Sequence, residues 1–386
     1  MPGVCLRFVR LACLACALCA CNQLAGIENP EHWDASRVSD GAPASDAPHA
    51  MSDAGSRCEV AAPKAARVVG VRTLGVQTQP PAVLQRNVTA SLALGSRAVW
   101  AFGGALLGVT SADGVRFLSS TAAESTLGDP VHLLESLDSL SVPKPLIPLT
   151  AEETAFNTGD SGDAQIWILP QSITAASSGT DAIVFYGKYL VRPDLNWTRI
   201  AGGIARLRDG AITATRDAQY LFNAPEPLFL LGGIVFDDYL HLYACNGSNG
   251  CTVARAPLAT IDRHDAWSTF SDSDSGSKWI SDLAGGSVVL ENVGGAISVS
   301  QNAHLGSLLA VYSEPFSSRI VVRTAPRPEG PWTAPELAFD SHESGDFGAV
   351  EHAAFSKNCG ELLLISYSHP VSAYAGSVQL VEATLE

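Results

Sequence analysis

Charged residues are scarce in this sequence, and basic residues are the scarcest. Only 16% of the 386 residues are charged, and 24 Lys and Arg stand against 39 Asp and Glu, giving a net charge of -15. Nucleic acid and anionic membrane surfaces are bound through positive faces, so this balance argues against both as partners. Beyond the first twenty residues, no apolar run reaches the roughly 18 residues that a membrane-spanning helix needs. Gly-x-Ser-x-Gly, phosphate-loop and dinucleotide fingerprints are also missing, which argues against the commonest serine hydrolase, nucleotide and NAD functions.

The N-terminus has the pattern of an export signal. Arg7 and Arg10 precede an apolar run over residues 11–20, which predicts a signal peptide at residues 1–20. The run ends in Leu-Cys-Ala-Cys21 and resembles a bacterial lipobox, in which Cys21 would receive lipid and become the first mature residue. The alternative is an ordinary signal peptide cut near Ala20. Asn22 resembles the signal for outer-membrane sorting if the source is Gram-negative; otherwise we expect the protein at the cell surface.

Residues 21–63 form a predicted flexible, acidic linker. Ala, Ser, Asp, Pro and Gly dominate this stretch, and large apolar residues are almost absent from it. Such a segment cannot bury enough surface to offset the entropy lost on ordering. We expect it to tether a folded domain of residues 64–386 to the membrane.

The cysteines beyond Cys21 are even in number, as suits an oxidising compartment. They are Cys58, Cys245, Cys251 and Cys359. The Asn-Gly-Ser-Asn-Gly sequence at 246–250 turns easily, which predicts a local Cys245–Cys251 disulfide. Cys58 and Cys359 would then join the start of the domain to its last part. A zinc site is the alternative, but no Cys-x-x-Cys or paired histidines accompany these residues, and we expect no metal there.

The domain is predicted to be all-β. Short β-rich runs bounded by Gly, Asp, Asn and Pro dominate it, and helical periodicity is scarce. Strong apolar runs carry an aromatic residue at Phe102, Tyr186, Tyr243, Tyr312 and Tyr367, and the last four are 57, 69 and 55 residues apart. The wider first interval holds a predicted long insert at 121–155. Five such units indicate a five-bladed β-propeller, with a sandwich or a two-domain β protein as the alternative.

The expected strands include residues 98–102, 182–186, 203–207, 240–243, 251–255, 308–312, 319–323, 361–367 and 378–382. Asp237 and Asp238 are a predicted hairpin turn. Residues 274–279 have the spacing of the sialidase Asp-box, a hairpin feature that supports blades and says little about substrate.

Several segments carry a resemblance to a known family. They are Val99–Gly103, Ile166–Pro170, Ser298–Asn302, Val311–Glu314, Arg323–Trp332 and Val350–His352. In this order they resemble a bacterial secreted family of five-bladed propellers, formerly a domain of unknown function, that includes endo-D-arabinanase glycoside hydrolases. The resemblance spans about residues 68–385. It implies a fold similar to the arabinanase and levansucrase propellers, with a glycan as the ligand class.

The resemblance also implies two catalytic aspartates, and this chain departs from the family at both positions. In the hydrolase members an Arg-Asp and a Phe-Gly-Asp bring two carboxylates to the axial cleft, where glycoside hydrolysis needs such a pair. The matching residues here are Arg86-Asn87 and Phe102-Gly103-Gly104. Asn87 can form hydrogen bonds but cannot act as a base at neutral pH, and Gly104 has no side chain. Either catalysis uses other acids or the site only binds.

Arg86 and Asn87 remain candidates for binding sugar. Glu351 and His352, on the inner run of the last unit, are further candidates for binding and weaker ones for catalysis.

Two more candidates have plain structural alternatives. Trp167 could stack on a sugar ring, although a strand tryptophan among apolar neighbours more often packs within the blade. Glu314 could contact ligand or be a solvated turn residue.

Asp160 and Asp163 could bind calcium, although a solvated turn is the simpler interpretation. No other cofactor is expected.

Three functions remain. The first is a lipoprotein whose propeller binds polysaccharide as a catalytically degenerate relative of these hydrolases, and the missing aspartates favour it. The second is an active glycoside hydrolase that cleaves furanosidic or related cell-wall glycans. The third is a protein-interaction scaffold. We expect a monomer, attached to the membrane through lipid at Cys21.

Overall fold

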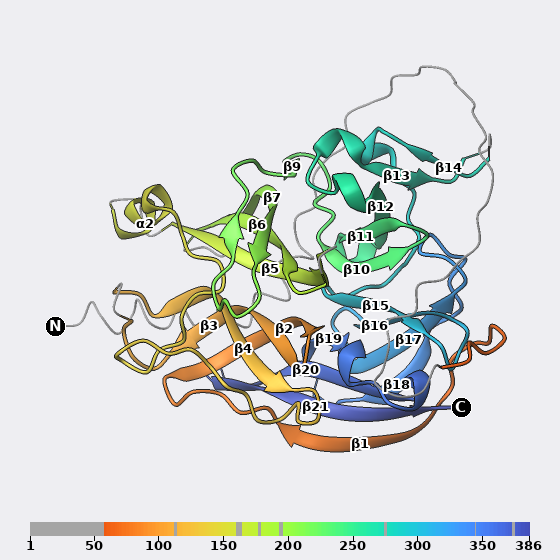
Figure 1. The fold of residues 1–386 in the computed structure, drawn as a ribbon, viewed down its shortest axis with the longest axis horizontal. Coiled ribbons are helices and arrows are strands. Elements are labelled where there is room, and N and C mark those ends of the chain that lie inside the picture. The colour runs from red at the N-terminus through yellow and green to blue at the C-terminus, as the bar shows by residue number, and fades with distance from the viewer. Residues whose placement is uncertain are drawn as a thin grey trace.

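The computed structural model describes residues 58–386, apart from 112–113, 160–163, 177–178, 193–195, 274–275, 344 and 373–374. The predicted signal peptide, Cys21 and most of the predicted linker lie outside the described residues. The strands form five sheets around a central axis (Figure 1). Within the described part of the chain, no helix is long and apolar enough to cross a membrane.

Each sheet is one blade, numbered here by the chain order of its innermost strand. Blades 1 and 2 consist of β2 (Val83–Leu94), β3 (Arg97–Leu107) and β4 (Phe117–Thr126), and of β5 (Gln165–Ala175), β6 (Ala182–Val191), β7 (Trp197–Leu207), β8 (Thr215–Arg216) and β9 (Phe222–Asn223). Blade 3 consists of β10 (Leu231–Phe236), β11 (Tyr239–Cys245), β12 (Cys251–Pro257), β13 (Ser268–Ser271) and β14 (Lys278–Ile280). Blades 4 and 5 consist of β15 (Ile297–Asn302), β16 (Ser307–Ser313), β17 (Arg319–Ala325) and β18 (Glu336–Asp340), and of β19 (Phe347–Glu351), β20 (Leu362–Ser372), β21 (Ala375–Leu385) and β1 (Val68–Val76). Helical segments are α2 (Ala151–Thr158) and the short 3-10 turns η2 (Gly247–Asn249), η3 (Leu258–Thr260), η4 (His264–Ala266), η5 (Leu283–Gly285), η6 (Ala353–Phe355) and η7 (Asn358–Gly360).

The innermost strands form a closed ring. β2 contacts β5, β5 contacts β10, β10 contacts β15, β15 contacts β19, and β19 contacts β2. The predicted five-bladed β-propeller is therefore confirmed, because the two sheets of a sandwich would not close such a ring. Blade 5 contains both ends of the domain, since β1 pairs antiparallel with β21. Main-chain hydrogen bonds between these two strands complete the last blade.

The recurring aromatic residue marks the second strand of each blade. Phe102, Tyr186, Tyr243, Tyr312 and Tyr367 lie on β3, β6, β11, β16 and β20. The first four are fully buried. The tyrosines at 186, 243 and 312 belong to hydrophobic clusters that also contain side chains of a neighbouring blade. The regular spacing of these aromatic residues in the sequence therefore reflects the packing between blades.

The turn and strand predictions agree with the structure. Asp237 and Asp238 connect β10 to β11 with φ angles of 49° and 62°, the left-handed conformation that a two-residue hairpin turn requires. Every predicted strand overlaps an observed one.

The insert of blade 1 begins later than predicted. Residues 121–126 belong to β4, which pairs with β3 along its whole length. The segment is rich in Ser, Thr and Ala, so its sequence has no strong apolar pattern, and the ladder to β3 makes it a strand. The insert proper lies between β4 and β5 and includes α2.

A buried carboxylate docks α2 onto blade 2. Thr150 and Glu153 form a capping box at the helix N-terminus. The Glu153 carboxylate also lies 2.6 Å from the Arg216 guanidinium and 2.7 Å from the Lys188 amine. These partners lower the pKa of Glu153 to about 2, although burial acts in the opposite direction.

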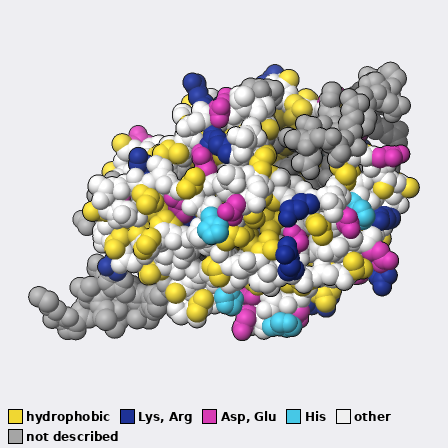
Figure 2. Space-filling model, turned by 60° about the horizontal axis from the view of Figure 1, so that its bottom comes forward, with side chains coloured by type: hydrophobic (Ala, Val, Ile, Leu, Met, Phe, Trp, Pro, Cys, Tyr) yellow, Lys and Arg dark blue, Asp and Glu magenta, His cyan; other side chains and the backbone are white. Residues whose placement is uncertain are grey.

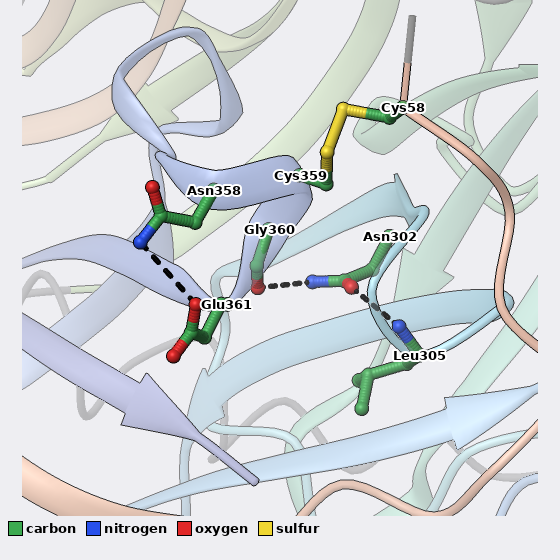
Figure 3. Close-up of a disulfide and its surroundings, with 7 residues drawn as sticks. All are labelled: Cys58, Asn302, Leu305, Asn358, Cys359, Gly360 and Glu361. Atoms are coloured by element: carbon green, nitrogen blue, oxygen red, sulfur yellow. Dashed lines mark hydrogen bonds between the residues drawn. A yellow bond between two sulfur atoms is a disulfide. The ribbon is translucent and has the colours of Figure 1, made fainter.

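Both predicted disulfides are present. Cys245 and Cys251 join the facing ends of β11 and β12, and Cys58 is bonded to Cys359 in η7. Beside the second bond, the Asn302 amide donates to the Gly360 carbonyl and accepts from the Leu305 amide, both at 2.9 Å (Figure 3). The segment after Cys58 is held at the same place, because the amides of residues 61 and 64 donate to the carbonyls of residues 303 and 305 in the β15–β16 turn.

Candidate functional site

A cleft opens at the propeller axis where the innermost strands of blades 1, 2 and 5 meet. It encloses about 100 Å³, well below the ~300–1,000 Å³ of pockets that bury whole drug-sized ligands. Such a cleft can receive one unit or the end of a chain. Its lining residues are Asn87, Val88, Thr89, Gly103, Leu169, Pro170, Gln171, Tyr189, Trp197, Gly295, Ala296, Phe347, Gly348 and Ser368.

β-Bulges shape this cleft. The strand register shifts within residues 86–90 of β2, 170–172 of β5 and 347–350 of β19. A bulge leaves a residue outside the ladder and re-aims its neighbours, and bulges are frequent beside functional sites. Gly348 has a φ of 70°, and a Cβ added there would meet no atom within 4 Å, so this bulge keeps the wall of the cleft open.

The cleft offers hydrogen-bonding groups without charge. None of its lining residues is Asp, Glu, His, Lys or Arg. Four buried polar atoms of these residues have no hydrogen-bond partner in the described part of the protein: Oδ1 of Asn87, Oγ1 of Thr89, Nε1 of Trp197 and Oγ of Ser368. Burial raises the pKa of Tyr189, so its phenol stays neutral. The site therefore suits an uncharged ligand with many hydroxyl groups.

Arg86 lies outside the cleft, inside blade 1. Its side chain is 1% exposed and forms a 2.6 Å ion pair with Glu135 of the insert. It also donates to the Thr78 carbonyl at 2.6 Å and stacks on Phe102. Burial lowers the pKa of Arg86 and raises that of Glu135, against their mutual attraction. The residue fastens the insert to the blade and is not presented to a ligand in the cleft.

Asn87 is a wall residue of the cleft, as the resemblance implies. It pairs with Gly103 across β2 and β3, and both residues line the cleft. Gly104 is the extra residue of the bulge opposite this pair and has a φ of 79°. The backbone at the second expected aspartate therefore favours glycine.

Glu351 and His352 are neighbours in sequence but bind different partners. Both Glu351 oxygens accept hydrogen bonds from serines, Ser300 at 2.6 Å and Ser356 at 2.9 Å. Burial raises the pKa of this carboxyl. Neither residue is among those that line the cleft.

His352 is a core residue. Its ring nitrogens lie 2.8 Å from Oγ of Ser91 and 2.7 Å from Oγ of Ser366, and its ring packs 4.4 Å from that of Trp100. Complete burial lowers its pKa to about 3. The imidazole is therefore neutral in the folded protein and has no exposed surface for a sugar.

Trp167 and Glu314 also lie away from the cleft. Trp167 is 2% exposed. Its ring stacks on Phe117 at 3.8 Å and meets Trp197 edge-on at 4.9 Å, so it supports the cleft residue Trp197 from behind. Glu314 lies in the turn after β16 and forms a 2.8 Å ion pair with Arg319 of the same hairpin.

The proposed calcium ligands Asp160 and Asp163 lie outside the described residues, as does Asp274 of the Asp-box pattern. Among the residues that the structure does describe, no group of three His, Cys, Asp or Glu side chains is placed to hold a metal ion.

Sequence reasoning missed an acid and a histidine that flank the cleft residues. Asp346 precedes Phe347, and His369 follows Ser368. Their side chains are joined by a 2.7 Å contact between Oδ1 and Nδ1, and the Asp346 side chain is 2% exposed. Burial raises the pKa of Asp346. Asp346 could have been identified from the sequence, because it directly precedes the innermost strand that ends at Glu351.

Trp197 and Tyr189 were also missed. They face each other across the β6–β7 hairpin, with ring centroids 5.7 Å apart. The available signal for Trp197 was a tryptophan that closely follows the turn-type sequence Pro-Asp-Leu-Asn at 193–196.

Sequence comparison identifies the second half of the propeller. Residues 226–378 match the family described as Domain of unknown function (DUF4185). This part of the chain carries a DUF4185 domain. The DUF4185 match spans β10 to β20 and confirms the family resemblance seen in the sequence. No curated protein matches the sequence.

Solved structures share the fold. A candidate hydrolase from Bacteroides ovatus ATCC 8483 superposes with a TM-score of 0.58 at 16% identity, covering 79% of this chain and 87% of its own. An exo-beta-1,3-galactanase from Phanerochaete chrysosporium, with bound galactotriose, gives 0.50 at 10% identity, covering 82% of this chain and 65% of its own. A GH43_1 enzyme from Xanthomonas citri, complexed with xylotriose, gives 0.46 at 13% identity, covering 80% and 89%. The chain thus shares its propeller fold with the candidate hydrolase and with the galactanase.

Proposed function

We propose that the propeller binds a polysaccharide at its axial cleft and does not cleave it. The main support for this proposal is the lining of the cleft. It contains amide, hydroxyl and indole groups with unused hydrogen-bonding capacity, and it contains no carboxylate or imidazole. Sugar hydroxyls supply both donors and acceptors for such groups. The aromatic rings of Tyr189 and Trp197 add apolar surface of the kind on which sugar rings pack.

The same lining argues against hydrolysis. A glycosidase needs one group to protonate the leaving oxygen and another to activate water or attack the sugar. Asn87 and Gly104 occupy the two positions where the family resemblance implies these acids. The nearby inner-strand acid Glu351 is buried and bonded to two serines. The chain therefore fits a catalytically degenerate member of a hydrolase-like fold, and the galactotriose bound to the galactanase neighbour supports carbohydrate as the ligand class.

The test measures retention and cleavage on one protein sample. The full chain with Cys21→Ser, exported without lipid, is presented to an array of bacterial and plant polysaccharides, and reducing ends are assayed on every retained glycan. We expect binding without release of reducing ends. Trp197→Ala and Asn87→Ala should each weaken binding about tenfold, equivalent to about 1.4 kcal/mol.

Trp332→Ala is the matched control, because Trp332 is also a partly buried tryptophan but lies in the β17–β18 connection. It should bind like the parent protein. Equal binding by all variants would remove the cleft from the proposal, and robust cleavage by the parent protein would overturn it. Retention of no glycan would leave a protein scaffold as the better interpretation.

Glycoside hydrolysis is the second candidate function, and Asp346 is the residue that favours it. A buried carboxyl with a raised pKa, next to a cleft residue, has the property of a general acid. If the parent protein releases reducing ends, Asp346→Asn should abolish release and leave binding intact. Glu351→Gln serves as the comparison, since a loss with that variant alone would assign the role to Glu351.

We also propose that Cys21 carries lipid and anchors the protein as a monomer to the bacterial envelope. Expressed with its own signal, the protein should take up labelled fatty acid and partition into detergent. Cys21→Ser should abolish both effects, while Cys19→Ser, which keeps a small residue in the signal, should not. Equal labelling of the Cys21 variant would contradict the anchor.

A further inference from the structure

Arg255 of blade 3 is held between two aromatic rings. Its guanidinium carbon lies 4.3 Å from the ring centroid of Tyr239 and 4.2 Å from that of Trp279. The three residues lie on β11, β12 and β14 of one sheet. Beneath them, His241 pairs with Arg255 across the ladder, and its ring meets that of Trp279 at 5.6 Å. The arrangement is therefore built on strands and is fixed before any ligand arrives.

The charge of Arg255 has no direct counter-charge. Elsewhere acidic and basic side chains lie close together on the surface (Figure 2), and Arg206, Arg216 and Arg319 each pair with a carboxylate. No ion pair or hydrogen bond of the Arg255 side chain occurs among the described residues, and its buried Nε has no partner. Glu329 and Asp237 act on it only through space.

The surroundings do not remove this charge. Burial lowers the pKa of Arg255, and the phenol of Tyr239 acts in the opposite direction. An arginine stays protonated at neutral pH through shifts of this kind. His241 adds no second charge, because burial and the neighbouring Arg255 lower its pKa to about 3.

We propose that Arg255, Tyr239 and Trp279 form a second binding site, which takes the carboxylate of an acidic sugar unit such as a uronate in a polysaccharide. The planar guanidinium presents paired N–H groups that match the two oxygens of a carboxylate. The guanidinium carbon lies over both rings, so the N–H groups are the part of Arg255 that is left to meet the ligand. The flanking rings provide apolar surface for the sugar that carries the carboxylate.

This site lies at the opposite end of the propeller from the axial cleft. The innermost strands of a propeller run in the same direction along the axis. The cleft lies at the beginning of β19 and just before β15, whereas Tyr239 follows the turn at the end of β10. The second site therefore does not depend on the function proposed for the cleft, and the two can be tested separately.

The experiment measures the affinity of a uronate oligomer by calorimetry. The exported full chain with Cys21→Ser is titrated with trigalacturonate, with galactotriose as the uncharged comparison, and with inorganic phosphate as a free oxyanion. We expect trigalacturonate to bind most tightly and to weaken as salt is raised. Arg255→Gln should lose at least about tenfold of that affinity, as expected for charge-assisted hydrogen bonds. Arg208→Gln, at an exposed arginine on blade 2, should change nothing.

Arg255→Lys keeps the proposal testable if the glutamine variant does not fold. Lysine retains the charge and can stay between the rings but lacks the paired N–H groups, so we expect a folded protein with about fivefold weaker binding. The proposal is overturned if the parent protein does not bind trigalacturonate, or if Arg255→Lys binds it equally well. It is also overturned if Arg208→Gln loses as much affinity, or if phosphate binds more tightly than the sugar. A lowered melting temperature without any uronate binding would leave Arg255 as a packing residue.

Discussion

Removing the Cys58–Cys359 bond should destabilise the domain much more than removing the Cys245–Cys251 bond. The bonded cysteines are 301 and 6 residues apart in the sequence. A disulfide stabilises mainly by restricting the unfolded chain, and the restriction grows with the logarithm of loop length. For these separations the chain-entropy treatment gives about 6 kcal/mol for the long loop and about 2 kcal/mol for the short one.

The folded state should change little in either case. The β1–β21 ladder still closes the ring without the long-range bond. Cys58 and Cys359 are partly exposed, so serine suits both positions, whereas Cys245 and Cys251 are buried and call for alanine.

Urea unfolding of the two double variants, compared with the parent protein, measures both free energies. The slope of the transition should also rise for Cys58→Ser with Cys359→Ser, because a less restricted unfolded chain exposes more surface. A long-loop variant that loses no more stability than the short-loop variant would refute the reasoning.

Three further predictions concern protonation, an ion pair and the degenerate site. Lowering the pH below 6.5 should destabilise the domain through His352 by up to about 1.4 kcal/mol per pH unit. The cause is that the imidazole binds a proton near pH 6.5 in the unfolded chain but only near pH 3 in the folded one. His352→Gln should therefore reduce the loss of unfolding free energy between pH 6.5 and pH 3, as measured by urea titrations. Glu153→Gln should cost about 3 kcal/mol in thermal unfolding, because it leaves Arg216 without its buried partner. Asn87→Asp with Gly104→Asp should lower stability by about 1 kcal/mol or more in urea unfolding, because position 104 has a left-handed backbone. It should also release some reducing ends, because it restores the carboxylate pair that hydrolysis needs; a stability equal to that of the parent protein would contradict the first expectation.

The fold was predictable because its periodic signals are local. An apolar run with an aromatic residue recurs once per blade, on the second strand. Tyr186, Tyr243 and Tyr312 in these runs pack against side chains of a neighbouring blade. The disulfides followed from an even number of cysteines and from the Asn-Gly turn between Cys245 and Cys251. β4 was missed because a strand of small and hydroxylated residues owes its conformation to pairing with β3, which is not visible in its own sequence.

The site was predictable only in part, because its wall is assembled from several blades. Asn87 was placed in the cleft through the family resemblance. Trp197 and Ser368 could not be placed, since bulges decide which side chains meet at the axis, and a single sequence does not reveal them. Glu351 and His352 are adjacent in sequence, but Glu351 ends β19 and His352 begins the turn into η6. Glu351 bonds to Ser300 and Ser356, whereas His352 enters the core beside Trp100.

The bond between Cys58 and Cys359 also fixes the place at which the N-terminal segment joins the domain. η7 lies between the end of β19 and the start of β20, whereas the cleft residues Phe347 and Ser368 lie toward the other ends of these strands. Ser368 lies six residues along β20 from Leu362, a distance of about 20 Å at ~3.3 Å per residue. A pull on the N-terminal segment is passed through the disulfide into blade 5, so β1 is not peeled from β21. The N-terminal segment therefore joins the domain at the end of blade 5 that lies away from the cleft residues Phe347 and Ser368.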